Sequence, residues 1–104
     1  METVTIVTSS GPRQVPALYR LGHLALIEAI EGGGGFVCSH LPTGYAMGRF
    51  ARREDGERYV RALAGDPALD WGFTMEDVRA GTERYRRCVE AARRAQQGGG
   101  AASG

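Results

Sequence analysis

The order of apolar and polar positions along the chain predicts strands first and helices later. Residues 3–8 are β-branched throughout, and Val4 and Ile6 would share one face of a short strand. Residues 9–16 contain Ser-Ser-Gly-Pro and then Val-Pro, a composition that is typical of a loop. We therefore expect one strand at the start of the chain and an irregular connection after it.

The apolar segment at residues 18–30 admits two interpretations. Its apolar residues occupy all sides at helical spacing, so no single stripe marks a surface helix. The interruption at Gly22 and the later glycine run favour a buried strand over about residues 22–30 that leads into a hairpin connection. Helix formers such as Glu28, with Gly32 as a helix cap, favour a helix instead. We favour the strand and keep the helix as the alternative.

A β-hairpin is predicted in the middle of the chain. Two short apolar or aromatic runs, residues 36–41 and 45–50, flank Pro-Thr-Gly at 42–44. Proline pre-sets the backbone for the first turn position, and glycine supplies the positive φ that a tight turn needs. On the first strand, Cys38 and His40 would share one face.

Two helices are predicted in the second half. Residues 53–64 carry acids in the first turn and an apolar inner stripe, and Gly-Asp-Pro at 65–67 ends the helix. A short aromatic connector at 69–73 follows. Thr74 then caps a helix over residues 75–96, in which apolar residues recur at three- and four-residue steps along one face.

These elements predict an α+β fold. A small, mainly antiparallel sheet of three or four strands would carry two helices on one face, and the C-terminal helix would be long and amphipathic. Residues 1–97 are expected to form a single domain, because the chain length is enough for one core and not for two. Residues 98–104 are expected to be a disordered Gly/Ala tail, because they bury no apolar area to offset the entropy of ordering.

Composition and charge narrow the class of protein. The hydrophobic fraction of 42% and the charged fraction of 24% are ordinary for a globular protein. A net charge of +1 argues against both a strongly basic DNA-coating protein and a strongly acidic nucleic-acid mimic. No apolar run approaches the roughly 20 residues of a membrane span, and no signal-peptide pattern is present. We therefore expect a cytoplasmic protein with two reduced cysteines and no membrane partner.

The residue types that carry chemistry do not form a familiar motif. His23, Cys38, His40 and Cys88 match the number of zinc ligands, but no pair has the spacing of a zinc finger. Ser39 and His40 are adjacent on a strand and would point to opposite faces, so they cannot form the hydroxyl–imidazole bond of a catalytic triad. The run of four glycines lacks the Lys-Ser/Thr and the helix of a phosphate loop. We expect no catalytic residue, no metal and no cofactor.

A protein partner is the leading expectation. The hairpin at 40–50 and the aromatic connector would present the contact residues, which are His40, Thr43, Tyr45, Trp71 and Phe73. Aromatic residues beside a helix N-terminus are a common type of binding hot spot. Burial of the two connector aromatics in the core is the competing interpretation.

Nucleic acid is the alternative partner. Arg49, Arg52 and Arg53 lie at the end of the predicted hairpin, near Tyr45. Basic and aromatic residues at a sheet edge can bind a single strand of nucleic acid. A homodimer is a further alternative, because a free sheet edge or the long last helix could pair with a second copy. A small enzyme or a metal-binding domain ranks third.

Residues 36–50, Phe-Val-Cys-Ser-His-Leu-Pro-Thr-Gly-Tyr-Ala-Met-Gly-Arg-Phe, carry a resemblance. With the helix that follows, this stretch resembles a pattern in short uncharacterised proteins of bacteriophages and integrated elements of GC-rich bacteria. The resemblance covers about a third of the chain and brings no catalytic residues with it. It implies a non-enzymatic accessory protein that binds a host protein machine, as anti-CRISPR proteins and polymerase inhibitors do.

Overall fold

The computed structural model describes residues 2–29 and 34–103, with side chains described as far as Gln96. Two antiparallel sheets and three helices make up these described ranges. In chain order the elements are β1 (Thr3–Thr8), β2 (Gly11–Pro16), β3 (Tyr19–Leu21), β4 (Leu24–Glu28), β5 (Phe36–His40), β6 (Tyr45–Phe50), α1 (Arg53–Ala64), α2 (Met75–Ala80) and α3 (Glu83–Ser103). The fold is α+β, as the sequence predicts.

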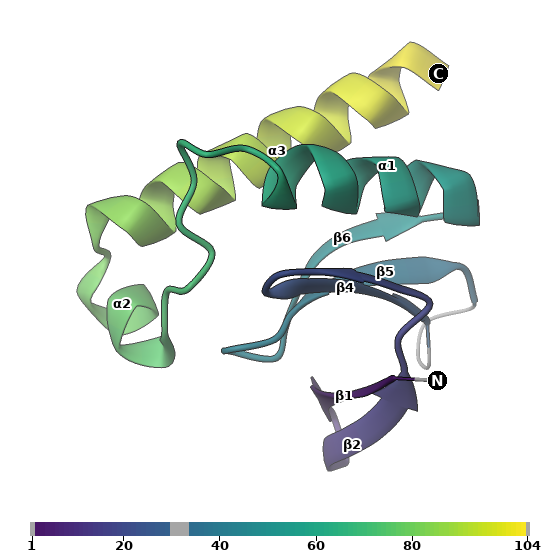
Figure 1. Ribbon diagram of the computed structural model, residues 1–104, viewed down its shortest axis with the longest axis horizontal. Helices are drawn as coiled ribbons and strands as arrows, with labels where there is room; N and C mark the ends of the chain where they lie inside the picture. The colour runs from purple at the N-terminus through teal and green to yellow at the C-terminus, as the bar shows by residue number, and fades with distance from the viewer. Residues whose placement is uncertain (1, 30–33, 104) are drawn as a thin grey trace.

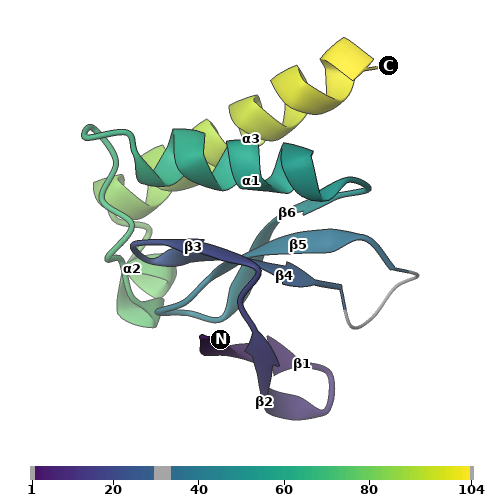
Figure 2. The same ribbon diagram turned by 45° about the vertical axis from the view of Figure 1, so that its right-hand side comes forward.

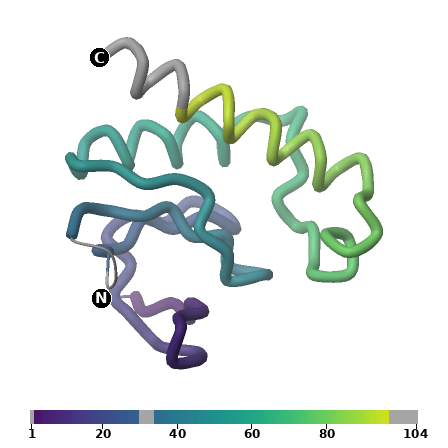
Figure 3. The backbone as a smooth tube through the Cα atoms, turned by 180° about the vertical axis from the view of Figure 1, so that it is seen from behind, coloured from purple at the N-terminus to yellow at the C-terminus, as the bar shows by residue number. Residues whose placement is uncertain are grey.

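The elements are arranged in three layers (Figure 1, Figure 2). Helices α1 and α3 cover one face of the four-stranded sheet, whose strand order is β3-β4-β5-β6, and the β1–β2 hairpin lies against the other face. Figure 3 shows the same layers from behind. Each interface has its own apolar core. We call the one around Leu26, Val60 and Phe73 the helical core, and the one around Ile6 and Ile27 the hairpin core.

The predicted loop at residues 9–16 is wrong, because Gly11–Pro16 forms strand β2. This strand pairs antiparallel with β1 along its whole length. Its prolines are tolerated because a two-stranded sheet has no third strand that needs their missing N–H groups. Gly11, at φ +106°, provides the backbone conformation that the tight reversal between the two strands requires.

Residues 18–30 form two strands rather than one. The strand prediction is confirmed over Leu24–Glu28, and the helix alternative is wrong. Gly22, at φ +60°, lies in the turn between β3 and β4, so the predicted start of the strand is wrong. All four residues from Leu24 to Ile27 are buried, because both faces of the sheet are covered. This double coverage explains why the segment shows no polar face in the sequence.

The predicted hairpin is confirmed as β5 and β6. Cys38 pairs with Gly48, whereas the next residue of β5, Ser39, pairs with Ala46. Met47 is therefore an extra residue in β6, and it forms a β-bulge. The bulge reverses the alternation of faces along β6. The connection between β4 and β5 includes residues 30–33, so the predicted glycine loop there lies partly outside the described residues.

The first predicted helix is confirmed as α1, with the predicted ends. Val60 and Leu63 are buried on its inner side. Gly56 lies there too, at a point where a Cβ atom would clash with the Leu26 side chain. The glycine therefore allows α1 to approach the sheet closely.

The helix predicted over residues 75–96 is wrong as a single element. Thr74 precedes α2 as the predicted cap, but Gly81 ends this helix in the left-handed conformation at φ +64°. Helix α3 then begins at Glu83. The helical spacing of apolar residues continues across the break, so periodicity alone does not reveal it.

Helix α3 extends toward the C-terminal end of the chain. Its side chains are described as far as Gln96, so the predicted domain boundary at residue 97 and the predicted disorder of residues 98–104 stay predictions. Within the described ranges, no helix is both long enough and apolar enough to cross a membrane.

Candidate functional site

A groove of about 740 Å³ lies between β6 and α3, and we call it the β6–α3 groove. Its walls come from β6, from α3 and from the connector that precedes α2. The lining residues are Tyr45, Ala46, Met47, Gly48, Phe73, Tyr85, Val89, Ala92, Arg93 and Gln96. Most of them are apolar or aromatic, and the volume lies in the usual range of ligand sites.

The sequence of β6 shapes one wall of the groove. Tyr45 pairs with His40 and therefore lies on the face that the helices cover. Gly48 has no side chain, and a Cβ atom there would come 2.6 Å from Gln96 Oε1. The glycine thus lets Gln96 reach the strand, where its side-chain amide donates to the Arg49 carbonyl and accepts from the Arg49 N–H, both at 3.2 Å. At this point α3 occupies the outer edge of β6 as a neighbouring strand would.

Helix α3 gives the groove a positive rim. Arg93 lines the groove, and Arg86, seven residues earlier, lies on the same side of the helix. Neither arginine has an ion-pair partner among the described side chains, whereas Arg84 and Arg87 are paired. No Asp or Glu is among the described lining residues. The groove therefore combines an apolar floor with two arginines that form no ion pair among the described side chains.

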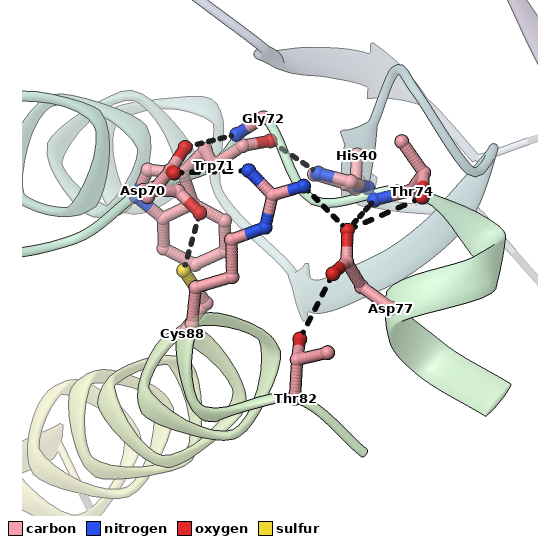
Figure 4. A network of polar contacts seen from close by, with 9 residues as sticks. His40, Asp70, Trp71, Gly72, Thr74, Asp77, Thr82 and Cys88 are labelled. Atoms are coloured by element: carbon pink, nitrogen blue, oxygen red, sulfur yellow. Dashed lines mark hydrogen bonds and ion pairs between the residues drawn. The ribbon is translucent and has the colours of Figure 1, made fainter. Parts of the chain in front are cut away.

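His40 supports the floor of the groove from inside. Its ring stacks on Phe73 with 3.9 Å between the ring centroids. Its Nε2 lies 2.7 Å from the Trp71 carbonyl oxygen, which can only accept, so Nε2 donates (Figure 4). Its Nδ1 therefore accepts from the Thr43 hydroxyl at 2.7 Å, and this hydroxyl oxygen accepts from the Tyr45 N–H. These bonds are complete with a neutral imidazole, and burial lowers the pKa of His40.

A second polar network joins α2, α3 and the connector (Figure 4). Asp77 accepts hydrogen bonds from the Thr74 N–H at 2.8 Å, from the Thr82 hydroxyl at 3.0 Å and from Arg84 at 2.6 Å. Arg84 also donates to Asp70 at 3.1 Å. The bond from Arg84 is the main reason that the pKa of Asp77 lies well below its usual range. The network fixes α2 against α3, and thereby the end of the groove.

The structure corrects the predicted set of partner contacts, because four of the five residues are buried. His40 and Phe73 are 0% and 1% exposed, and Trp71 and Thr43 are 5% and 7% exposed. Trp71 and Phe73 are therefore buried in the core, as the competing interpretation of the connector expected. Tyr45, at 43% exposure, is the member of the set that a partner can reach.

The predicted nucleic-acid residues do not form one surface. Arg52 and Arg53 each pair with a glutamate, at 3.1 and 2.7 Å. Arg49 pairs across the sheet with Val37 and so lies on the hairpin side, while Tyr45 lies on the helical side. The bulge explains the separation, because residues 45 and 49 would share a face in a regular strand.

Both thiols are core groups. Burial raises the pKa of Cys38 to about 12 and the pKa of Cys88 to about 11. The thiolate is the nucleophilic form of cysteine, so both side chains are in the unreactive form at neutral pH. In the described ranges, no group of three or more His, Cys, Asp or Glu side chains is arranged to hold a metal ion.

Of the described residues that line the groove, the predicted site residues include only Tyr45 and Phe73. Sequence reasoning missed the other eight, among them Val89, Arg93 and Gln96. Val89 belongs to the predicted apolar stripe of the last helix, and the helical repeat places Arg93 beside it. These signals mark a helix face, but the opposite wall depends on the bulge in β6, for which the residues give no signal.

No protein-family model, curated protein or solved structure matches this chain. We therefore infer its function from the residues and geometry of the β6–α3 groove.

Proposed function

We propose that this chain is a non-enzymatic binding module that takes an acidic, amphipathic segment of a partner protein into the β6–α3 groove. One observation carries the proposal: an apolar groove lies beside Arg86 and Arg93, and neither arginine has an acidic partner among the described side chains. An amphipathic helix docks by placing its apolar residues in such a groove. Acidic residues beside these anchors would complement the arginines and would speed association.

The length of the groove fits a short helix. Tyr85 and Gln96 both line it and are eleven residues apart on α3, which corresponds to about 16 Å along the helix axis. A partner helix of about three turns covers this distance and places two or three apolar anchors on the floor. The exposed ring of Tyr45 borders the same groove, and tyrosine is enriched among residues that dominate binding energy.

A protein segment suits this groove better than nucleic acid does. Single-stranded nucleic acid needs a positive groove along its backbone and exposed aromatic platforms. Here the lining is mostly apolar, and the other candidate arginines are paired or lie on the far face. The setting that the phage-type resemblance implies, an accessory protein that binds a host protein machine, agrees with this proposal.

Selection from a random library of displayed 14-residue peptides tests the proposal. We expect the enriched peptides to carry apolar residues at helical spacing, flanked by Asp and Glu. Their affinity, measured by fluorescence anisotropy, should fall about tenfold for Arg93→Glu, because the substitution reverses a rim charge. It should fall at least as much for Val89→Asp, which places a charge on the apolar floor.

Arg94→Glu is the matched control. It makes the same charge change on the same helix at an exposed residue that does not line the groove. We expect it to leave peptide affinity within about twofold of the wild-type value. Enriched peptides that are basic, or that bind Val89→Asp as well as wild type, would contradict the proposal. Tighter binding of a single-stranded oligonucleotide than of any peptide would favour the nucleic-acid alternative.

A further inference from the structure

The outer edge of strand β1 carries backbone groups that no described strand uses. Strands β1 and β2 form their own two-stranded sheet (Figure 2), and the Ala17 N–H donates to the Glu2 carbonyl at 2.9 Å. Backbone groups alternate in direction along an antiparallel strand, so those of Val4 point toward β2, and those of Thr3 and Thr5 point away from it. Both threonines are exposed, and within the described residues their outward groups form no hydrogen bond.

The other edge strands of the described sheets are protected. On β2, Pro12 and Pro16 occupy outward positions and have no N–H to offer a neighbouring strand. On β6, the side chains of Gln96 and Tyr59 bond to the backbone. Strand β3 is only three residues long and carries the charge of Arg20. Prolines, charges, short strands and covering side chains are the usual protection of sheet edges, and β1 has none of them.

The sequence of β1 favours pairing with a further strand. Residues 3–8, Thr-Val-Thr-Ile-Val-Thr, are all β-branched and include no charge, proline or glycine. Six-residue segments of this kind have a high tendency to join other strands. An uncharged strand can also pair with its own copy, because no like charges are placed opposite each other. The edge therefore fits a second copy of this chain.

The β5–β6 turn limits the register of such a pairing. Gly44 packs on Val7, where a Cβ atom on the glycine would clash with the valine side chain, so the open part of the edge is centred on Val4. A symmetric antiparallel pairing about this point places Thr3 opposite Thr5 of the partner subunit. Each such pair exchanges both of its backbone hydrogen bonds. The two Val4 side chains then meet on the inner face and extend the hairpin core.

We infer that the chain forms a symmetric dimer in which β1 pairs antiparallel with β1 of a second copy. The two hairpins join into one continuous sheet in the strand order β2-β1-β1-β2. The contact is short, so we expect a weak dimer with a Kd of about 100 µM. None of the described residues that line the β6–α3 groove belongs to the hairpin, so the dimer leaves the groove free and does not depend on the function proposed for it.

Concentration dependence of the wild-type chain is the first test. Sedimentation velocity should show mainly monomer at about 10 µM and mainly dimer at about 1 mM, as mass action requires for this Kd. The amides of Thr3 and Thr5 should exchange their hydrogens about fourfold more slowly at the higher concentration, in proportion to the smaller fraction of monomer. This measurement needs no substitution, so it remains decisive even if a variant does not fold.

Thr5→Pro and Gln14→Pro are a matched pair that assigns the contact to this edge. The first removes an outward N–H of β1 and leaves the ladder between β1 and β2 intact, as the natural prolines of β2 do. We expect it to remain monomeric at about 1 mM. Gln14 lies opposite Thr5 in the register, and its N–H points outward on the other edge of the hairpin. Gln14→Pro should therefore dimerise like wild type.

Three results would overturn the inference. The wild-type chain could sediment as a monomer at about 1 mM, or exchange at Thr3 and Thr5 could be independent of concentration. A Thr5→Pro variant that folds and dimerises like wild type would assign the dimer contact to another surface.

Discussion

At the residue scale, His40 shows how a polar side chain becomes part of a core. Histidine next to cysteine and serine in the sequence looks like a candidate for catalysis or metal binding. In the structure both ring nitrogens are engaged, one by the Trp71 carbonyl and one by the Thr43 hydroxyl, and the ring stacks on Phe73. The side chain therefore fixes the β5–β6 turn to the aromatic connector and supports the groove.

This arrangement predicts a pH dependence of stability. Burial lowers the pKa of His40 below the ordinary value of 6.5, so the unfolded chain binds this proton more readily than the folded chain. The contribution to the free energy of unfolding is complete above about pH 6.5 and falls as the pH decreases below that value. Urea unfolding at about pH 7.5 and about pH 5.5 measures the change, and the NMR titration of the His40 Cε1–H assigns it. A folded-state pKa of 6.5 or above for His40 would contradict the prediction.

Thr43→Val tests the hydrogen bond from the other side. Valine has nearly the same shape but no hydroxyl, so His40 Nδ1 would lose its donor inside the core. We expect the free energy of unfolding to decrease by about 1–3 kcal/mol, the cost of an unsatisfied buried acceptor. Thr5→Val is the control, because Thr5 lies exposed in β1, and we expect a change within about 0.5 kcal/mol there. Equal effects at the two sites would show that the buried bond contributes nothing specific.

At the element scale, the pairing of Gln96 with β6 bears on self-association. Strand β6 is an edge strand, and unpaired edges promote pairing with other chains. The Gln96 amide occupies both backbone groups of Arg49, and the Tyr59 hydroxyl donates to the Met47 carbonyl at 2.6 Å. Side chains from both long helices thus cover part of the edge.

Gln96→Ala is expected to uncover this edge. The Arg49 amide should exchange its hydrogen about fivefold faster, because a net hydrogen bond of about 1 kcal/mol is lost. Sedimentation velocity should also show more dimer at high concentration than for Arg94→Ala, a substitution on the exposed side of the same helix. Unchanged exchange at Arg49 would mean that the Gln96 contact does not protect the strand.

The elements that depend on local patterns could be predicted from the sequence, and those that depend on pairing could not. Strand β1, the β5–β6 hairpin and α1 follow from side-chain type, turn residues and caps. Strand β2 was missed because proline is tolerated there only by virtue of having a single neighbouring strand. The bulge at Met47 leaves no local signal, yet it decides that Tyr45 and Arg49 face opposite sides. For this reason the predicted arginine and aromatic patch does not exist as one surface.

At the scale of the whole molecule, the sheet separates two apolar cores of unequal size. Among the residues whose side chains are described, the helical core contains ten buried residues and the hairpin core five. Because hydrophobic stabilisation grows with buried apolar area, the β1–β2 hairpin should be held less firmly than the helices. The β6–α3 groove lies on the side of the stronger interface.

Two neighbouring residues of β4 test this division. Leu26 faces the helical core and Ile27 the hairpin core, and they are 0% and 3% exposed. Leu26→Ala should lower the free energy of global unfolding by about 2–5 kcal/mol, because it leaves a cavity in the core that holds the helices. Ile27→Ala should act more locally, because the hairpin can detach while the sheet and helices stay folded. Hydrogen exchange should then be faster throughout β1 and β2 and nearly unchanged at the slowest amides of α1. If the amides of α1 and of the hairpin lose protection equally in Ile27→Ala, the two cores unfold as one cooperative unit and the proposed division is wrong.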